Sequence, residues 1–213
     1  MLPHTTVAAV AFAPELAPPG TYARTSRQTV FTRALASARG RCLALLLDRL
    51  GLPAATHVRT GRSGEPRFPA GLVGSITTKG TVVLAVAGKP SACLATIGID
   101  LEHVGPDAGL LERAIAPEGL PRLQPQSLRL LAAFAAKEAV YKAVFPLSRQ
   151  PLDFPDVLLR WRRTSFAAIT HFAETTCVAV SGSIAVRGMW VLAAAVGQPR
   201  KCSLFAHRRA IIL

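Results

Sequence analysis

The chain has 213 residues, of which 50% are hydrophobic and 17% charged, and it carries a formal net charge of +13. This composition excludes an intrinsically disordered protein, and no apolar run approaches the ~20 residues that a membrane-spanning helix needs. The positive excess indicates an anionic partner: nucleic acid, anionic lipid, a polyphosphate ligand or an acidic protein.

The first half of the chain predicts strands and one long helix. In chain order we expect a strand at residues 7–13, a helix at 30–50, a loop at 61–71 and a strand–turn–strand unit over 72–88. Gly40 is expected to interrupt the helix and Gly51 to end it, because glycine disfavours the helical backbone. The loop is dense in glycine and proline, which punctuate regular structure.

The second half repeats the mixture of strands and helices. We expect a strand at residues 93–102, a short helix at 110–116, a long helix at 128–145 and a hairpin of residues 176–186 and 189–196. The fold class is therefore α+β, with two halves of similar content. Residues 1–96 are taken as the N-terminal half and residues 97–213 as the C-terminal half.

Two features indicate a cytoplasmic protein. The N-terminus lacks the basic start of a secretory signal peptide. The four cysteines are far apart, without CxxC or metal-ligand spacing, which favours free thiols in a reducing compartment.

Two acidic residues end the strand at 93–102. Asp100 and Glu102 are two positions apart, so their side chains point to the same side of the strand. Carboxylates held this close repel each other unless a cation lies between them, and hard oxygen ligands suit Mg²⁺. The alternative is a strand that ends in solvent, where acidic residues are common.

A second set of charges lies on the long helix. At about 100° per residue, one face carries Leu131, Phe134, Ala135, Glu138, Lys142 and Phe145. A buried carboxylate needs a partner, a metal or water. If helix and strand pack together, Glu138 joins Asp100 and Glu102 in a three-carboxylate cluster, and Lys142 faces phosphates held by the same metal. The alternative is an ordinary Glu–Lys pair on a solvated face. Lys137 is expected to point elsewhere.

These stretches resemble the paired signature of a known family. The matching segments are GIDLE at 98–102, FAAKEAVYKAVF at 134–145, GEPRFPAGLVGSITTKG at 64–80 and ARGRCLALLLDRLG at 38–51. They are similar to GxDxE, FSxKExxYK, GxPxWPxGxVGSIxHxxG and GRxCAxxAL of the 4′-phosphopantetheinyl transferases. Their order and spacing resemble the larger, pseudo-dimeric type that includes the enterobactin- and surfactin-pathway enzymes. The resemblance covers about residues 37–157.

The resemblance implies a fold and a reaction. The two halves are expected in a pseudo-twofold arrangement with the active site at their interface. A carrier-protein serine attacks the β-phosphate of coenzyme A, and adenosine 3′,5′-bisphosphate leaves. Asp100, Glu102 and Glu138 match the family's Mg²⁺ ligands, and Glu138 is also the candidate base. Lys142 matches the lysine that stabilises the pyrophosphate.

Further residues are implied as ligands of the coenzyme A phosphates. They are Arg41 on the first helix, Arg62 and Arg67 in the loop, and Ser75, Thr77 and Thr78 in the following strand. Thr78 replaces the family's phosphate-contacting histidine and cannot carry its positive charge. The neighbouring Lys79 is a possible substitute, although adjacent strand residues point to opposite faces.

The positive net charge also favours an acidic protein partner. Carrier proteins of this system are acidic, and a basic enzyme attracts them. The expected protein is a cytoplasmic monomer that activates a carrier in siderophore or secondary-metabolite biosynthesis. The competing hypothesis is a degenerate, non-catalytic basic protein that binds coenzyme A, a carrier protein or nucleic acid. Nucleic acid is not favoured, because the arginines are dispersed and no zinc-finger or RNP motif is present.

Overall fold

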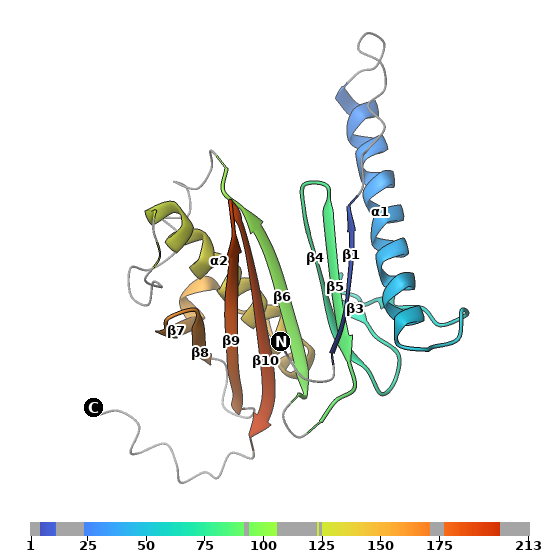
Figure 1. Ribbon diagram of the computed structural model, residues 1–213. Coiled ribbons are helices and arrows are strands. Elements are labelled where there is room, and N and C mark those ends of the chain that lie inside the picture. Colours follow the sequence, from blue (N-terminus) through green and yellow to red (C-terminus); the bar gives the residue numbers. More distant parts are fainter. Residues whose placement is uncertain are drawn as a thin grey trace.

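The computed structural model describes residues 5–11, 24–91, 94–105, 123, 125–170 and 177–200 (Figure 1). Its elements are β1 (Thr5–Ala11), α1 (Arg24–Arg49), β2 (Arg59–Thr60), β3 (Pro66–Arg67), β4 (Val73–Lys79), β5 (Val82–Gly88), β6 (Thr96–His103), α2 (Gln126–Ser148), the 3-10 turn η2 (Phe154–Asp156), β7 (Val157–Arg162), β8 (Ser165–Thr170), β9 (Cys177–Arg187) and β10 (Trp190–Arg200). The fold is α+β, as predicted. No helix in this described part of the chain is long and apolar enough to cross a membrane.

The first sheet has the strand order β1-β5-β4, and all its pairs are antiparallel. Side chains on β5 alternate, so Val83 and Ala85 pack with Ile76 of β4 against Cys42 and Leu46 of α1. The helix therefore covers one face of this sheet, as Figure 1 shows.

The second sheet has the order β6-β10-β9-β8-β7, and α2 packs across one of its faces. The helix lies unusually close to β6 at Gly98. A Cβ added there would lie 1.9 Å from the carbonyl oxygen of Ala139 and 2.6 Å from the backbone nitrogen of Ala143. Gly98 is therefore needed for the helix to rest on this strand.

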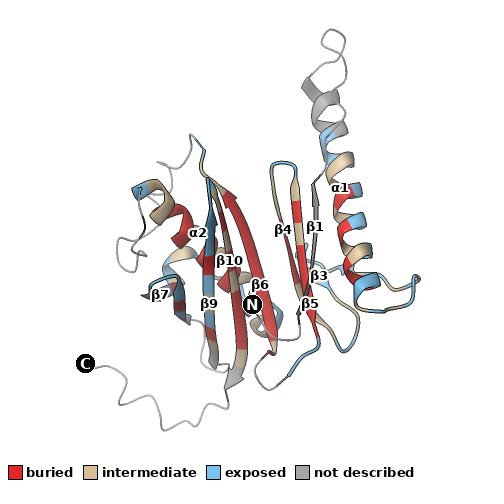
Figure 2. Cartoon of the chain, in the orientation of Figure 1, coloured by how far each residue is buried: buried red, intermediate tan, exposed pale blue. Residues whose placement is uncertain are grey.

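The two sheets meet at β4 and β6, which lie side by side in Figure 1. Side-chain hydroxyls on β4 make this junction. Ser75 Oγ accepts from the backbone N–H of Ile99 at 3.1 Å, and Thr77 Oγ1 accepts from that of Leu101 at 3.3 Å. Figure 2 shows that buried residues follow both strands. The hydroxyls thus satisfy backbone donors that would otherwise be buried without acceptors.

Several predicted boundaries differ from the structure. Gly40 does not interrupt the first helix, because α1 runs through it from Arg24 to Arg49. The second helix also continues beyond Pro146, to Ser148. The predicted loop contains the short strand β3, which pairs with β2. Packing against a sheet outweighs the local cost of the glycine and the proline in these helices.

The hairpin β7–β8 was missed in the sequence. Its signal is an alternation in which Val157 and Leu159 are buried while Leu158 and Arg160 are exposed. The turn lacks glycine, and Arg163 adopts the left-handed conformation with φ 57°. A two-residue turn without Gly or Asn gives little sequence signal.

Some predictions lie outside the described residues or remain open. The short helix expected at 110–116 is one of the former. Cys42 is buried, as expected, and its thiol donates to the carbonyl oxygen of Val83 at 3.8 Å. The two main described sheets differ in size, with three and five strands, and β2-β3 forms a separate two-stranded sheet. The pseudo-twofold relation and the division at residue 96 therefore stay predictions.

Candidate functional site

Asp100 lies at the junction of the two sheets. It shares a strand face with Gly98, the face on which α2 packs. Lys142 Nζ of α2 donates to its Oδ1 at 2.5 Å, and Thr77 Oγ1 of β4 donates to the same oxygen at 3.0 Å. The other oxygen, Oδ2, is buried without a hydrogen-bond partner. Three elements distant in sequence thus converge on one buried carboxylate.

Glu102, two positions on, forms an ion pair with Lys79 at the end of β4. The side chain of Glu102 is 11% exposed, whereas that of Lys79 is 42% exposed. Lys79 therefore shares the strand face of Thr77 and points at the predicted site. Burial raises the pKa of Glu102, and the hydrogen bond and charge of Lys79 oppose this shift, while the charge of Asp100 adds to it.

Glu138 lies on the flank of α2, half-buried like Phe134, Tyr141 and Lys142. The face predicted for Glu138 is mixed: Leu131, Ala135 and Phe145 are buried as expected, whereas Phe134, Glu138 and Lys142 are partly exposed. Burial raises its pKa, and the charges of Asp100 and Glu102 add to this while Lys142 opposes it. The three carboxylates are thus near enough to influence one another.

This donor set fits a hard divalent cation in its chemistry. Asp100 offers a buried, unpartnered oxygen, and the mutual repulsion of Asp100, Glu102 and Glu138 would be relieved by positive charge. As the side chains lie, no three His, Cys, Asp or Glu residues of the described chain gather closely enough to hold a metal. Magnesium ligation by these residues stays a prediction.

A cavity of about 380 Å³ lies beside these charges. Residues of both halves line it: Arg39, Ser63, Gly64, Glu65, Pro66, Gly74, Ser75, Ile76, Thr77, Thr78, Asp100, Tyr141, Lys142, Phe145 and Pro146. Ser75 and Thr77 are buried and already bind β6, so their hydroxyls have a structural role. Thr78 Oγ1 is buried without a partner. Direct phosphate binding by these three residues stays a prediction.

The arginine that lines this cavity is Arg39, which the sequence analysis missed. The predicted Arg41 is exposed and donates to Ser37 Oγ of its own helix at 2.8 Å. Arg41 and Arg62 are not among the described residues that line the cavity. A sequence signal existed, because Leu35, Arg39, Cys42 and Leu46 share one face of α1 at helical spacing. Glu138 was predicted from the same kind of signal, a charged residue within an apolar stripe.

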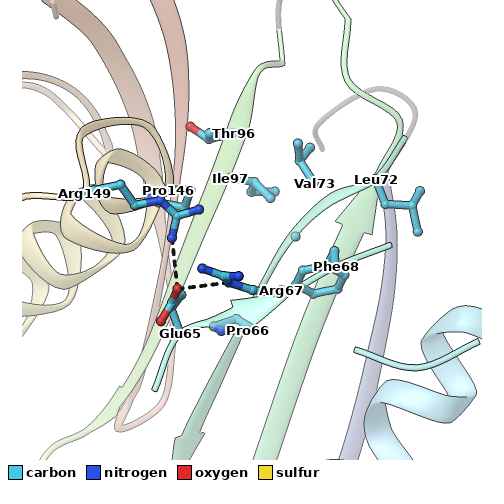
Figure 3. A pocket seen from close by; sticks show the side chains of 11 residues that line it. Glu65, Pro66, Arg67, Phe68, Leu72, Val73, Thr96, Ile97, Pro146 and Arg149 are labelled. Atoms are coloured by element: carbon cyan, nitrogen blue, oxygen red, sulfur yellow. Dashed lines mark hydrogen bonds and ion pairs between the residues drawn. The ribbon is translucent and has the colours of Figure 1, made fainter. Parts of the chain in front are cut away.

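A second cavity, of about 360 Å³, shares Glu65, Pro66, Gly74 and Pro146 with the first in its lining (Figure 3). Arg67 and Arg149 extend into it and bind Glu65 Oε1 at 3.4 and 2.9 Å. Glu65 also accepts from the backbone N–H of Ser63 at 3.1 Å. The pKa of Glu65 is lowered, chiefly by the hydrogen bond from its own backbone N–H, and burial acts in the opposite direction. Arg67, a predicted phosphate ligand, thus lines this cavity.

Lys137 points away from the site, as expected. Its side chain is buried, and Nζ donates to the carbonyl oxygen of Phe154 at 2.7 Å. It ties α2 to the turn η2 that precedes β7.

Comparisons with known proteins show the family of the chain. Residues 96–195 match the family model of the 4′-phosphopantetheinyl transferase superfamily, and residues 22–88 match the model of the 4′-phosphopantetheinyl transferase N-terminal domain. The chain is 32% identical over 193 residues to 4′-phosphopantetheinyl transferase PptT of Mycobacterium tuberculosis, covering 81% of this chain and 82% of that protein.

Two further relatives match over about half of their length. The chain is 38% identical over 126 residues to 4′-phosphopantetheinyl transferase Svp of Streptomyces mobaraensis, covering 55% of this chain and 50% of the relative. It is 36% identical over 120 residues to 4′-phosphopantetheinyl transferase Npt of Nocardia iowensis, covering 54% and 53%. The chain belongs to the 4′-phosphopantetheinyl transferase superfamily.

Proposed function

We propose that this protein transfers the 4′-phosphopantetheine arm of coenzyme A to a serine of an acyl or peptidyl carrier protein. The serine hydroxyl forms a bond to the β-phosphorus, the bond to the leaving adenosine 3′,5′-bisphosphate breaks, and the hydroxyl proton goes to a base. The observation that carries this proposal is the meeting of Asp100 of β6 with Lys142 of α2 and Thr77 of β4 beside the larger cavity.

Asp100, Glu102 and Glu138 would hold a divalent cation, most naturally Mg²⁺. When bound, such an ion neutralises charge on a diphosphate. Glu138 is the proposed base, and burial, which raises the pKa of its carboxyl, makes the carboxylate a better proton acceptor. Lys142 lines the cavity and would place its ammonium against the diphosphate.

The donor would occupy the larger cavity between the two sheets. Arg39 is the basic residue of α1 that lines it, and a guanidinium pairs well with phosphate. Thr78 offers a free hydroxyl there. Arg41, Arg62 and Arg67 would contribute charge from outside this cavity.

The acceptor would be an acidic carrier protein attracted by the net charge of +13. We extend the proposal to a cytoplasmic monomer of two halves, 1–96 and 97–213, in a pseudo-twofold arrangement. A role in siderophore or other secondary metabolism belongs to the same proposal.

The test is intact-mass measurement of an apo carrier protein incubated with coenzyme A and Mg²⁺. We expect a gain of one phosphopantetheine arm, and its loss with EDTA, Asp100→Asn or Glu138→Gln. Asp48→Asn, an exposed carboxylate of α1, is the matched control and should retain activity. Transfer that persists in both site variants would contradict the assigned roles.

The competing binding protein is separated by thermal shift. Stabilisation by coenzyme A that grows with Mg²⁺ supports the transferase. Stabilisation by single-stranded DNA that fades steeply with salt, without any transfer to a carrier, supports the basic binding protein.

A further inference from the structure

The backbone of Lys79 is held in place by a tight turn. It pairs with Val82 at the last register position of β4 and β5, and Gly80, one of the two residues between them, has φ 56°. Such a short turn fixes which face each strand residue presents. Lys79 therefore emerges on the face of Thr77, where its ammonium contacts Glu102 Oε2.

The charges around the site do not balance. Asp100, Glu102 and Glu138 interact with one another, and the lysines that neutralise them are Lys142 and Lys79. Three carboxyl groups thus face two ammonium groups, so the cluster attracts a further cation whenever all three carboxyls are ionised. Because Lys79 Nζ contacts Oε2 of Glu102, a metal ion that took this oxygen would have to displace the ammonium.

Lys79 is suited to leave. Its side chain is 42% exposed, whereas that of Lys142 is 27% exposed and that of Asp100 is 7% exposed. An exposed lysine on a flexible stem regains hydration when it swings away, so its ion pair is weak. The pair of Lys142 with Asp100 is better shielded and less easily replaced.

We propose that Lys79 competes with a divalent cation for Glu102 and thereby lowers the affinity of the site for free metal. This inference rests on the proposed function, because it takes Asp100, Glu102 and Glu138 as metal ligands. Its consequence is that the site fills when a diphosphate donor adds negative charge, which attracts both the metal and the released ammonium. The released Lys79 would then bring positive charge to the donor from the strand face of Thr77, a charge that the neutral Thr78 lacks.

The test measures metal binding in the absence of donor. Free Mn²⁺ is counted by EPR during titration of the full-length protein at pH 8, and Mg²⁺ is then added as competitor. Lys79→Met is expected to bind either ion about fivefold more tightly than the parent, the scale of one exposed ion pair. Lys79→Arg keeps the charge and is expected to match the parent. Lys89→Met removes an equal charge from an exposed position outside both cavities and is the second control.

Equal or weaker metal binding by Lys79→Met would overturn the proposal, and Lys79→Gln repeats the test if the methionine variant does not fold. A parent protein that binds neither ion without donor would overturn it as well. Carrier-protein modification, measured separately by mass, decides the proposed function. Transfer by the parent together with unchanged metal binding in the variant would refute the role of Lys79 alone.

Discussion

Arg149 Nη1 at the end of α2 donates a 2.9 Å hydrogen bond to Glu65 Oε1, 84 positions earlier in the chain. The pair connects the glycine- and proline-rich loop of the first half to the main helix of the second. Glu65 lines both cavities, and Figure 3 shows Arg149 and Arg67 reaching its carboxylate.

Loss of this contact is expected to affect donor binding more than chemistry. Arg149→Ala should raise KM for coenzyme A about threefold with little change in kcat, because an exposed pair contributes little and acts here by positioning the loop. Arg162→Ala, an exposed arginine of β7, is the control. Steady-state kinetics with a carrier protein check this, and a fall in kcat at constant KM would contradict it.

The two arginines of α1 are expected to differ. Arg39→Ala should weaken coenzyme A binding about tenfold, the effect of losing one well-placed phosphate contact. Arg41→Ala should change it little, since Arg41 is exposed and bonded to Ser37. Calorimetric titration of coenzyme A into each variant provides the measurement. Equal losses of coenzyme A affinity in the two variants would show that these arginines act through long-range charge and not through direct contact with the ligand.

Thr77 is expected to stabilise the junction of the two sheets. Thr77→Val keeps the shape but leaves the backbone N–H of Leu101 and the carboxylate of Asp100 without this hydroxyl, which should cost about 1–3 kcal/mol. Thr77→Ser retains the oxygen and should lose much less. Urea denaturation gives the free energy of unfolding, and equal stability of the two variants would refute this role.

Two glycines are expected to respond in opposite directions. Gly98→Ala places a Cβ against the backbone of α2 and should destabilise the fold by about 3 kcal/mol or more. At Gly40 a Cβ meets nothing within 4 Å, so Gly40→Ala should stabilise α1 by about 0.5–1 kcal/mol. Thermal melts of both variants test the close packing of α2 on β6.

Glu138 is expected to make stability depend on pH. Burial raises the pKa of its carboxyl above 4.5, so the folded state holds the proton more tightly than the unfolded chain does. Stability contributed by this group is therefore lost as pH rises from about 4.5 through the raised pKa. With EDTA present, Glu138→Gln should gain stability over the parent across this window and keep the gain above it. Denaturation between pH 4 and 8 checks this, and a difference that does not vary with pH would contradict it.

The sequence by itself determined the elements with strong local signals. Alternation and continuous apolar runs predicted β4, β5 and β6, and helical spacing predicted α1 and α2. The pattern of Asp100 and Glu102 followed by Glu138 and Lys142 predicted a charged site, because carboxylates in apolar settings need a compensating charge. The family was predicted from the resemblance of these stretches to a known signature.

Only the tertiary structure decided which charges meet. Lys79 and Arg39 gained their places from the packing of β4 beside β6 and of α1 on the first sheet, contacts that span long stretches of chain. Local periodicity gives the face on which a side chain lies, but the partner it meets there depends on how the elements pack. For the same reason the sequence pattern predicted the exposed Arg41, and not Arg39, as a phosphate ligand. The hairpin β7–β8 gave little sequence signal because its turn has Arg163 in the left-handed conformation instead of a glycine.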